Sequence, residues 1–114
     1  MKARLPDGYG KQNMNKLMQQ AQEMQDQMAA KQAELEETEY TVKSAGGMVE
    51  IVIRGDYQIT AVKLEKDAVD PEDVEMLEDL VAAAFNDAVR TVKETAEKEM
   101  GAISEAFPGL NGLM

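Results

Sequence analysis

The sequence predicts a small α+β domain in which one long helix precedes a three-stranded antiparallel sheet and another long helix follows it. Apolar residues recur at helical spacing near both ends of the 114-residue chain, whereas its middle alternates between apolar and polar residues. Two glycine-containing turns divide that middle region into three strands. A chain of this length forms one domain, and the expected order of elements is α-β-β-β-α.

The first predicted helix covers residues 13–37, after a stretch that shows no periodicity. Pro6, Gly8 and Gly10 interrupt residues 1–12, so we expect a mobile arm there. Asn13 or Asn15 is expected to cap the helix. Positions spaced alternately by three and four residues form one seam along it, and these are Met14, Leu17, Ala21, Met24, Met28, Lys31 and Leu35. The seam predicts packing against the domain or a partner; the alternative is a Met-rich groove that adapts to other proteins.

Three strands are predicted at residues 40–43, 48–54 and 57–64, joined into an antiparallel meander. Gly46-Gly47 supplies positive φ angles for the first turn, and Gly55-Asp56 signals the second. Alternation in the second strand places Val49, Ile51 and Ile53 on one face and Glu50, Val52 and Arg54 on the other. In the third strand, the same rule places Thr60, Val62 and Leu64 opposite Ile59 and Ala61.

The last helix is predicted to begin with Asp70 as its N-cap and Pro71 at its first position. It is expected to reach about Met100, where Gly101 ends it and leaves residues 101–114 as a flexible tail. Acidic residues crowd its first turns, where the helix dipole favours negative charge, and these are Glu72, Asp73, Glu75, Glu78 and Asp79. Because the cluster lacks the glycine and the ligand spacing of a calcium loop, no metal site is predicted.

A stripe of small and apolar side chains follows one face of this helix at three- and four-residue spacing. Its members are Leu77, Val81, Ala84, Ala88 and Val92. Such a stripe is typical of a packing surface, and alanine lets another backbone come close. We therefore predict that these residues form the packing or dimer surface of the protein.

The lengths of the elements predict a homodimer. The two helices would extend about 36 and 45 Å, whereas a seven-residue strand reaches only about 23 Å. Part of each apolar stripe must then be covered by a partner, and a second copy is the simplest one. We expect an obligate homodimer whose helix ends project beyond the central body.

The composition excludes several classes of function. Without cysteine or histidine, the chain lacks thiolate nucleophiles, imidazole bases and the usual zinc ligands. An enzyme would depend on paired carboxylates such as Glu78 and Asp79, and nothing beside them in the sequence separates a general acid from a general base. No run approaches the roughly eighteen apolar residues of a membrane span. We therefore expect a cytoplasmic protein without catalytic activity, cofactor, membrane contact or small-molecule substrate.

Charge is distributed unevenly along the chain. The formal net charge is −10, yet residues 1–16 hold four basic residues against one acidic residue, which leaves +3 in this segment and −13 in the remainder. The four basic residues are Lys2, Arg4, Lys11 and Lys16. This distribution is that of an acidic body with a basic arm.

Two segments of the chain read EMLEDLVAAAFNDA at residues 75–88 and NMNKLMQQAQEMQ at residues 13–25. They closely resemble the YbaB/EbfC family of bacterial nucleoid-associated proteins. The resemblance covers about residues 10–100, so residues 13–100 are expected to form one domain of this type. It implies small cytoplasmic homodimers, shaped like tweezers, that bind DNA at the nucleoid and act on chromosome organisation or gene expression. No cofactor or catalytic centre is implied.

The resemblance also implies which residues contact DNA. By position in the family, the residues on the projecting parts would be Lys11 and Lys16 of the first helix and Arg90, Lys93 and Lys98 of the last. The basic arm adds Lys2 and Arg4 as further candidates. The chain departs from the family in its first helix, where other members often carry several lysines and this one has Gln22, Glu23, Gln25, Asp26 and Gln27.

A protein-binding module is the alternative function. Prefoldin chaperone subunits also join two long helices through β-hairpins and are often acidic. The break in the first seam at Lys31 and the three-stranded meander favour the DNA-binding protein instead.

Overall fold

The computed structural model describes residues 7–107, with side chains from residue 13 onward. Its helices are α1 (Asp7–Glu37) and α2 (Val74–Glu105), and its strands are β1 (Glu39–Ser44), β2 (Val49–Arg54) and β3 (Ile59–Leu64). Short 3₁₀ turns lie at Ala45–Gly47 and Lys66–Ala68. The predicted α+β class and the α-β-β-β-α order are confirmed.

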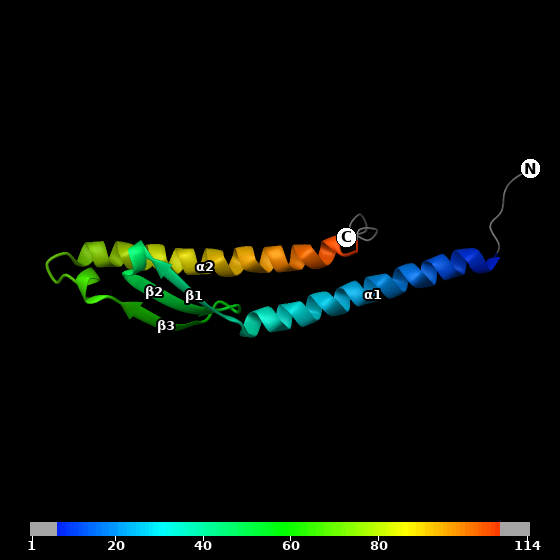
Figure 1. The fold of residues 1–114 in the computed structure, drawn as a ribbon, viewed down its shortest axis with the longest axis horizontal. Coiled ribbons are helices and arrows are strands. Elements are labelled where there is room, and N and C mark those ends of the chain that lie inside the picture. The colour runs from blue at the N-terminus through cyan, green and yellow to red at the C-terminus, as the bar shows by residue number, and fades with distance from the viewer. Residues whose placement is uncertain (1–6, 108–114) are drawn as a thin grey trace, which may run out of the picture.

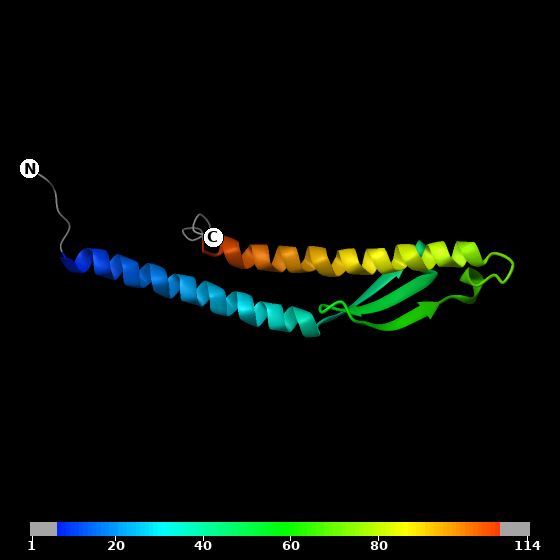
Figure 2. The same ribbon diagram turned by 180° about the vertical axis from the view of Figure 1, so that it is seen from behind.

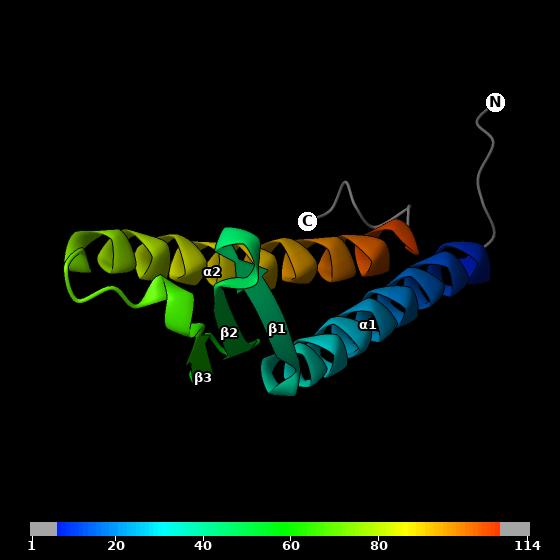
Figure 3. The same ribbon diagram turned by 60° about the vertical axis from the view of Figure 1, so that its left-hand side comes forward.

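The molecule is a long rod and not a sphere. Its principal extents are 87 × 25 × 16 Å, and its radius of gyration is 23.2 Å, compared with about 13 Å for a compact domain of 100 residues. The N-terminal half of α2 lies over the sheet (Figures 1 and 2). The C-terminal part of α1 runs antiparallel beside the C-terminal half of α2, and the N-terminal part of α1 extends past the end of α2. Figure 3 shows the sheet and α1 on the same side of α2.

The core lies between β2 and α2. Alternation along β2 buries every second side chain, so that Val49, Ile51 and Ile53 are completely buried, as the sequence predicts. They pack against Ala84 and Ala88, and Val92 completes the cluster. Small side chains at these helix positions allow the sheet to approach the helix closely.

This packing accounts for part of the predicted stripe. Ala84 and Ala88 were predicted to lie on a packing or dimer surface, and they are completely buried within the chain. Leu77 and Val81, nearer the start of the same stripe, are only half-buried. The small residues of α2 are therefore explained by the sheet of the same chain and do not by themselves support a dimer.

Helix α1 begins earlier than the sequence pattern predicts. It starts at Asp7, directly after Pro6, whereas residues 7–12 were expected to belong to the arm. Asn13 and Asn15 lie inside the helix and do not cap it. A glycine costs a helix about 1 kcal/mol relative to alanine, and a helix already formed propagates through such residues once nucleated.

Both ends of α2 also differ from the prediction. The N-cap is Asp73 and not Asp70: its side chain accepts a hydrogen bond from the backbone N–H of Met76, with a distance of 3.1 Å. Asp70 instead stabilises the preceding turn, where its Oδ1 accepts from the backbone N–H of Glu72 at 2.9 Å. At the other end, α2 passes through Gly101 and ends at Glu105.

The sheet is the predicted antiparallel meander, with strand order β1-β2-β3. Its first turn uses positive φ angles at Ala45, Gly46 and Gly47 (54°, 68° and 93°), which glycine adopts at little cost. In the second turn the left-handed residue is Tyr57, with φ of 68°. Gly55 in that turn is required for a different reason, its close approach to α1.

A β-bulge changes which side chains of β3 share a face. Pairing runs regularly from Val49↔Leu64 to Val52↔Ala61, and then Ile53 pairs with Ile59, so Thr60 is the extra residue of a bulge. Ile59 therefore lies on the same face as Val62 and Leu64, contrary to the strict alternation predicted. Since residues paired across strands point to the same side, these three extend the face that α2 covers over β1 and β2.

Among residues 7–107, no helix combines the length and the apolar character that crossing a membrane requires.

Candidate nucleic-acid interface

The seam of α1 divides into a packed part and an uncovered part. Met24 and Leu35 are buried, with 1% and 9% exposure, while Met14 and Leu17 are 58% and 37% exposed. The packed part lies beside α2, and Lys31 marks the contact because its Nζ lies 3.8 Å from the Oε2 of Glu99. Toward its N-terminus, α1 extends beyond the end of α2 (Figure 1). We name residues 8–22 the projecting segment.

The projecting segment differs from the rest of the chain in charge. It contains Lys11 and Lys16 and no acidic residue, whereas residues 23–37 contain five acidic residues and one lysine. The boundary in charge therefore coincides with the boundary between the uncovered and the packed parts of α1. Six amide side chains accompany the two lysines: Gln12, Asn13, Asn15, Gln19, Gln20 and Gln22.

The two sides of the projecting segment have different chemistry. Helical spacing places Asn15, Gln19 and Gln22 on one face, opposite the seam that carries Leu17 and Ala21. All three amides are exposed. The predicted DNA-contacting residues were all basic and did not include these amides. The signal that could have found them is a stretch, residues 8–22, that is rich in amides and contains no acidic residue. Asparagine and glutamine side chains are common donors to phosphate oxygens in protein–DNA complexes.

Of the four basic residues within residues 1–16, Lys16 is the one whose side chain the structure describes. It is exposed, and no ion pair joins it to another described residue. Lys11 belongs to α1, but the structure describes only its backbone. Lys2 and Arg4 lie outside the described residues. The structure thus places Lys11 and Lys16 on one projecting helix.

The three basic residues of α2 lie elsewhere, on the body of the molecule. Arg90 forms an ion pair with the Oδ1 of Asp87, whose Oδ2 accepts a hydrogen bond from the Ser44 hydroxyl at 2.9 Å. Lys93 and Lys98 are exposed, but acidic residues adjoin them in the sequence, namely Glu94, Glu97 and Glu99. The structure therefore separates the predicted DNA-contacting residues into two groups: one on an acid-free segment of α1, and one on α2, where Arg90 is paired with Asp87 and acidic residues stand among the two lysines in the sequence.

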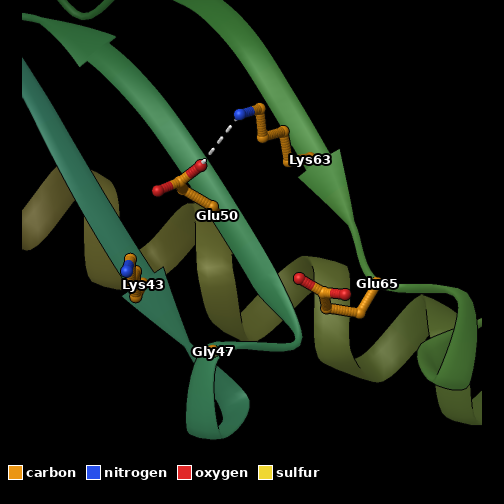
Figure 4. A pocket seen from close by; sticks show the side chains of 5 residues that line it. All are labelled: Lys43, Gly47, Glu50, Lys63 and Glu65. Carbon is orange, nitrogen blue, oxygen red and sulfur yellow. Dashed lines mark ion pairs between the residues drawn. The ribbon is translucent and has the colours of Figure 1, made fainter.

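A shallow hollow of about 220 Å³ lies on the sheet face that points away from α2. Figure 4 shows Lys43, Glu50 and Lys63 side by side on the three strands, with Glu65 beyond them. The register pairs Glu50 with both lysines, and its Oε2 lies 3.9 Å from the Nζ of Lys63. Since the hollow contains equal numbers of basic and acidic residues, it has no net attraction for phosphate.

A second hollow lies between β1 and α2 and measures about 360 Å³. It also contains two basic residues, Lys43 and Arg90, and two acidic residues, Asp87 and Glu94. In the part of the chain that the structure describes, no three Asp or Glu side chains are grouped so as to hold a metal ion. The body therefore offers mixed charge, and the projecting segment is the better candidate for nucleic acid.

Comparison with known proteins agrees with the resemblance seen in the sequence. Residues 10–107 match the YbaB/EbfC DNA-binding family. A nucleoid-associated protein of Agathobacter rectalis is 48% identical over 97 residues, which span 85% of this chain and 86% of that protein. Another, from Lachnoclostridium phytofermentans, is 44% identical over 111 residues, or 95% of this chain and 93% of that one.

The fold also has a counterpart among solved structures. The crystal structure of the uncharacterized protein HP0035 from Helicobacter pylori matches with a TM-score of 0.60 and covers 76% of this chain and 91% of its own. At 22% identity this likeness concerns the fold alone. From the family match along most of its length and from its close relatives, the chain belongs to the YbaB/EbfC DNA-binding family.

Proposed function

We propose that this protein is a nucleoid-associated protein that binds DNA as a homodimer, through phosphate contacts, and so affects chromosome organisation or gene expression. The observation that carries the proposal is the coincidence on α1 of the acid-free stretch with the uncovered stretch. Family membership and the names of the relatives support DNA as the partner. Lys11 and Lys16, together with Lys2 and Arg4, would supply the phosphate contacts.

Screening explains how an acidic protein can hold DNA in this way. At physiological ionic strength the Debye length is about 8 Å, whereas a helical segment of fifteen residues is about 22 Å long. Most of the projecting segment therefore lies beyond the reach of the acidic body. The exposed amides of Asn15, Gln19 and Gln22 would add hydrogen bonds to phosphate oxygens without reading the base sequence.

The homodimer is supported by apolar surface on the sheet. Ile59, Val62 and Leu64 are 40%, 44% and 40% exposed although they lie on the core-facing side of the sheet. Together they form an apolar strip beside the buried face of β2. A second copy placed against this strip would complete the cover of the sheet.

DNA binding at two salt concentrations tests the proposal. We expect the parent protein to bind linear and supercoiled DNA, with a slope of about −0.9 in log affinity against log salt for each phosphate contact. Replacing Lys2, Arg4, Lys11 and Lys16 together by Ala should reduce both the affinity and the slope for every DNA tested. Replacing these four residues should leave the melting temperature nearly unchanged.

A matched pair of variants separates a local contact from a change in overall charge. Lys11→Ala with Lys16→Ala removes two positive charges from α1, and Lys43→Ala with Lys63→Ala removes two from the sheet. The first pair should weaken binding more than the second. If the quadruple variant binds as tightly as the parent with an unchanged slope, the arm and α1 are not the contact, and Arg90, Lys93 and Lys98 become the candidates. Absence of binding at low salt would favour a protein partner instead.

A further inference from the structure

An apolar flank of α2 lies toward the apolar strip of β3. Phe85 packs against the core cluster and is half-buried. It lies about 160° around the helix from Asp87, whose carboxylate accepts a hydrogen bond from Ser44 at the end of β1. Because β1 and β3 lie on opposite sides of β2, the flank with Phe85 is the one toward β3. Val81 and Val89 share this flank at four-residue spacing.

The flank of α2 and the strip of β3 adjoin the same buried side chains of β2. Phe85 packs against the cluster that contains Ile51, and Ile51 pairs with Val62 of β3. The described residues leave this surface partly exposed, with Val62 at 44% and Val89 at 43%. We name it the apolar patch, and its six members are all uncharged: Ile59, Val62, Leu64, Val81, Phe85 and Val89.

Neither terminal stretch of this sequence can cover the apolar patch. Along α2, Phe85 lies about 30 Å before Glu105, the last residue of the helix, whereas residues 108–114 extend at most about 25 Å. Residues 1–6 adjoin Asp7, which lies about 42 Å along α1 from Leu35, at the end that points away from the sheet (Figure 1). The apolar patch is therefore available to another molecule.

A second copy of the chain fits this surface. Two copies that each carry a net charge of −10 repel each other, so they approach closely only where both surfaces are uncharged. In a two-fold interface each copy contributes the same surface. The apolar patch of one copy then meets an uncharged apolar surface of equal size on the other.

The spacing of the elements distinguishes two ways in which β3 could meet its counterpart. Since α2 lies over β1 and β2, pairing the free edges of two β3 strands into one sheet would place the two α2 helices about 19 Å apart. Helices in contact lie about 8–10 Å apart, so this pairing would leave both strips of β3 exposed in the gap. Face-to-face packing covers the strip and the flank together.

We infer that a second copy packs face to face on the apolar patch, so that the strip of β3 and the flank of α2 in each copy are covered by those of its partner. The free edge of β3 stays unpaired in this arrangement. The inference rests on the homodimer proposed above, adds α2 to its interface and specifies how the two sheets meet.

Val89→Asp tests the contribution of α2. Val89 is already 43% exposed, so the variant should fold, but the dimer would bury an unpaired charge. Ala83→Asp is the matched control, because Ala83 is an exposed residue of the same helix and lies about 120° around it from Val89. Analytical ultracentrifugation should show that Val89→Asp raises the dissociation constant of the dimer at least about tenfold and that Ala83→Asp leaves it nearly unchanged. Circular dichroism checks that both variants keep the helix content of the parent.

The outcomes separate this inference from the homodimer itself. A parent protein that stays monomeric would disprove the homodimer and the inference with it. A dimeric parent whose dissociation constant does not change in Val89→Asp would overturn the inference alone, because α2 would then lie outside the interface.

Hydrogen exchange in β3 tests whether its free edge is paired. The backbone N–H of Glu65 donates to the carbonyl oxygen of Met48, with a distance of 2.9 Å. Alternation along the strand then directs the N–H of Lys63 toward β2 and those of Val62 and Leu64 toward the free edge. In the parent dimer, NMR should show that Val62 and Leu64 exchange at least about tenfold faster than Lys63. Equal protection at these three positions would mean that two β3 strands pair edge to edge, and would overturn the inference.

Discussion

Gly55 lies directly against the end of α1, because a Cβ added to it would stand 1.6 Å from the carbonyl oxygen of Leu35. The backbone N–H of Gly55 also donates to the carbonyl oxygen of Thr38, with a distance of 2.9 Å. The turn between β2 and β3 therefore closes onto the point where α1 passes into β1. Glycine is required here by this close approach, since no side chain fits between the two backbones.

Gly55→Ala should consequently destabilise the protein severely. The backbone of one segment must shift to admit the methyl group, and we expect the free energy of unfolding to fall by at least about 3 kcal/mol. Gly101→Ala is the control: it lies inside α2 with nothing within 4 Å of its added Cβ, and should stabilise by about 0.5–1 kcal/mol. Urea denaturation at one fixed protein concentration measures both. A stable Gly55→Ala variant would mean that α1 and this turn are not in contact.

Ala84→Glu should unfold the protein, whereas Ala83→Glu should be tolerated. Ala84 is completely buried against the sheet, whereas Ala83, the preceding residue of the same helix, is exposed. A buried charge without a partner costs several kcal/mol, which is a large part of the roughly 5–15 kcal/mol that holds a domain together. Circular dichroism during thermal unfolding distinguishes the two variants. Equal melting temperatures would contradict the packing of α2 on β2.

Val62→Asp should weaken self-association if the apolar strip of β3 is the dimer surface. Val62 lies on that strip, and Ala61 lies on the other face of the same strand, so Ala61→Asp introduces the same charge where no partner is expected. Analytical ultracentrifugation should show a dimer for the parent and for Ala61→Asp, and dissociation for Val62→Asp. A folded parent that stays monomeric at micromolar concentration would disprove the homodimer.

Chelators should not change the stability of the protein. The carboxylates at the start of α2 already have structural roles, since Asp73 caps the helix and Asp70 holds the preceding turn. We expect identical melting curves with EDTA and with millimolar magnesium or calcium. A ligand that binds the folded state must raise the melting temperature. A clear rise with either metal would therefore contradict the prediction that the acidic cluster binds no metal.

Local patterns determined the elements of this fold, and they were less informative about where the elements begin and end. The alternation of Val49, Ile51 and Ile53 predicted β2 because a strand with one buried face has a period of two residues. The same rule misplaced Ile59, because a bulge depends on pairing with a neighbouring strand. The cap of α2 was also misplaced: Asp70 and Asp73 both suit a helix start, and only the structure shows which one accepts from the helix.

The sequence by itself determined the secondary structure, the family and the charge asymmetry, since all three depend on the order and the type of residues along the chain. Only the tertiary structure decided what each apolar stripe faces. The sheet occupies the N-terminal half of α2 and buries Ala84 and Ala88, which leaves the other half of α2 to cover only the C-terminal part of α1. The projecting segment of α1, residues 8–22, is uncovered for that reason: burial depends on which surfaces meet in space, and no spacing along one helix specifies how far its partner extends.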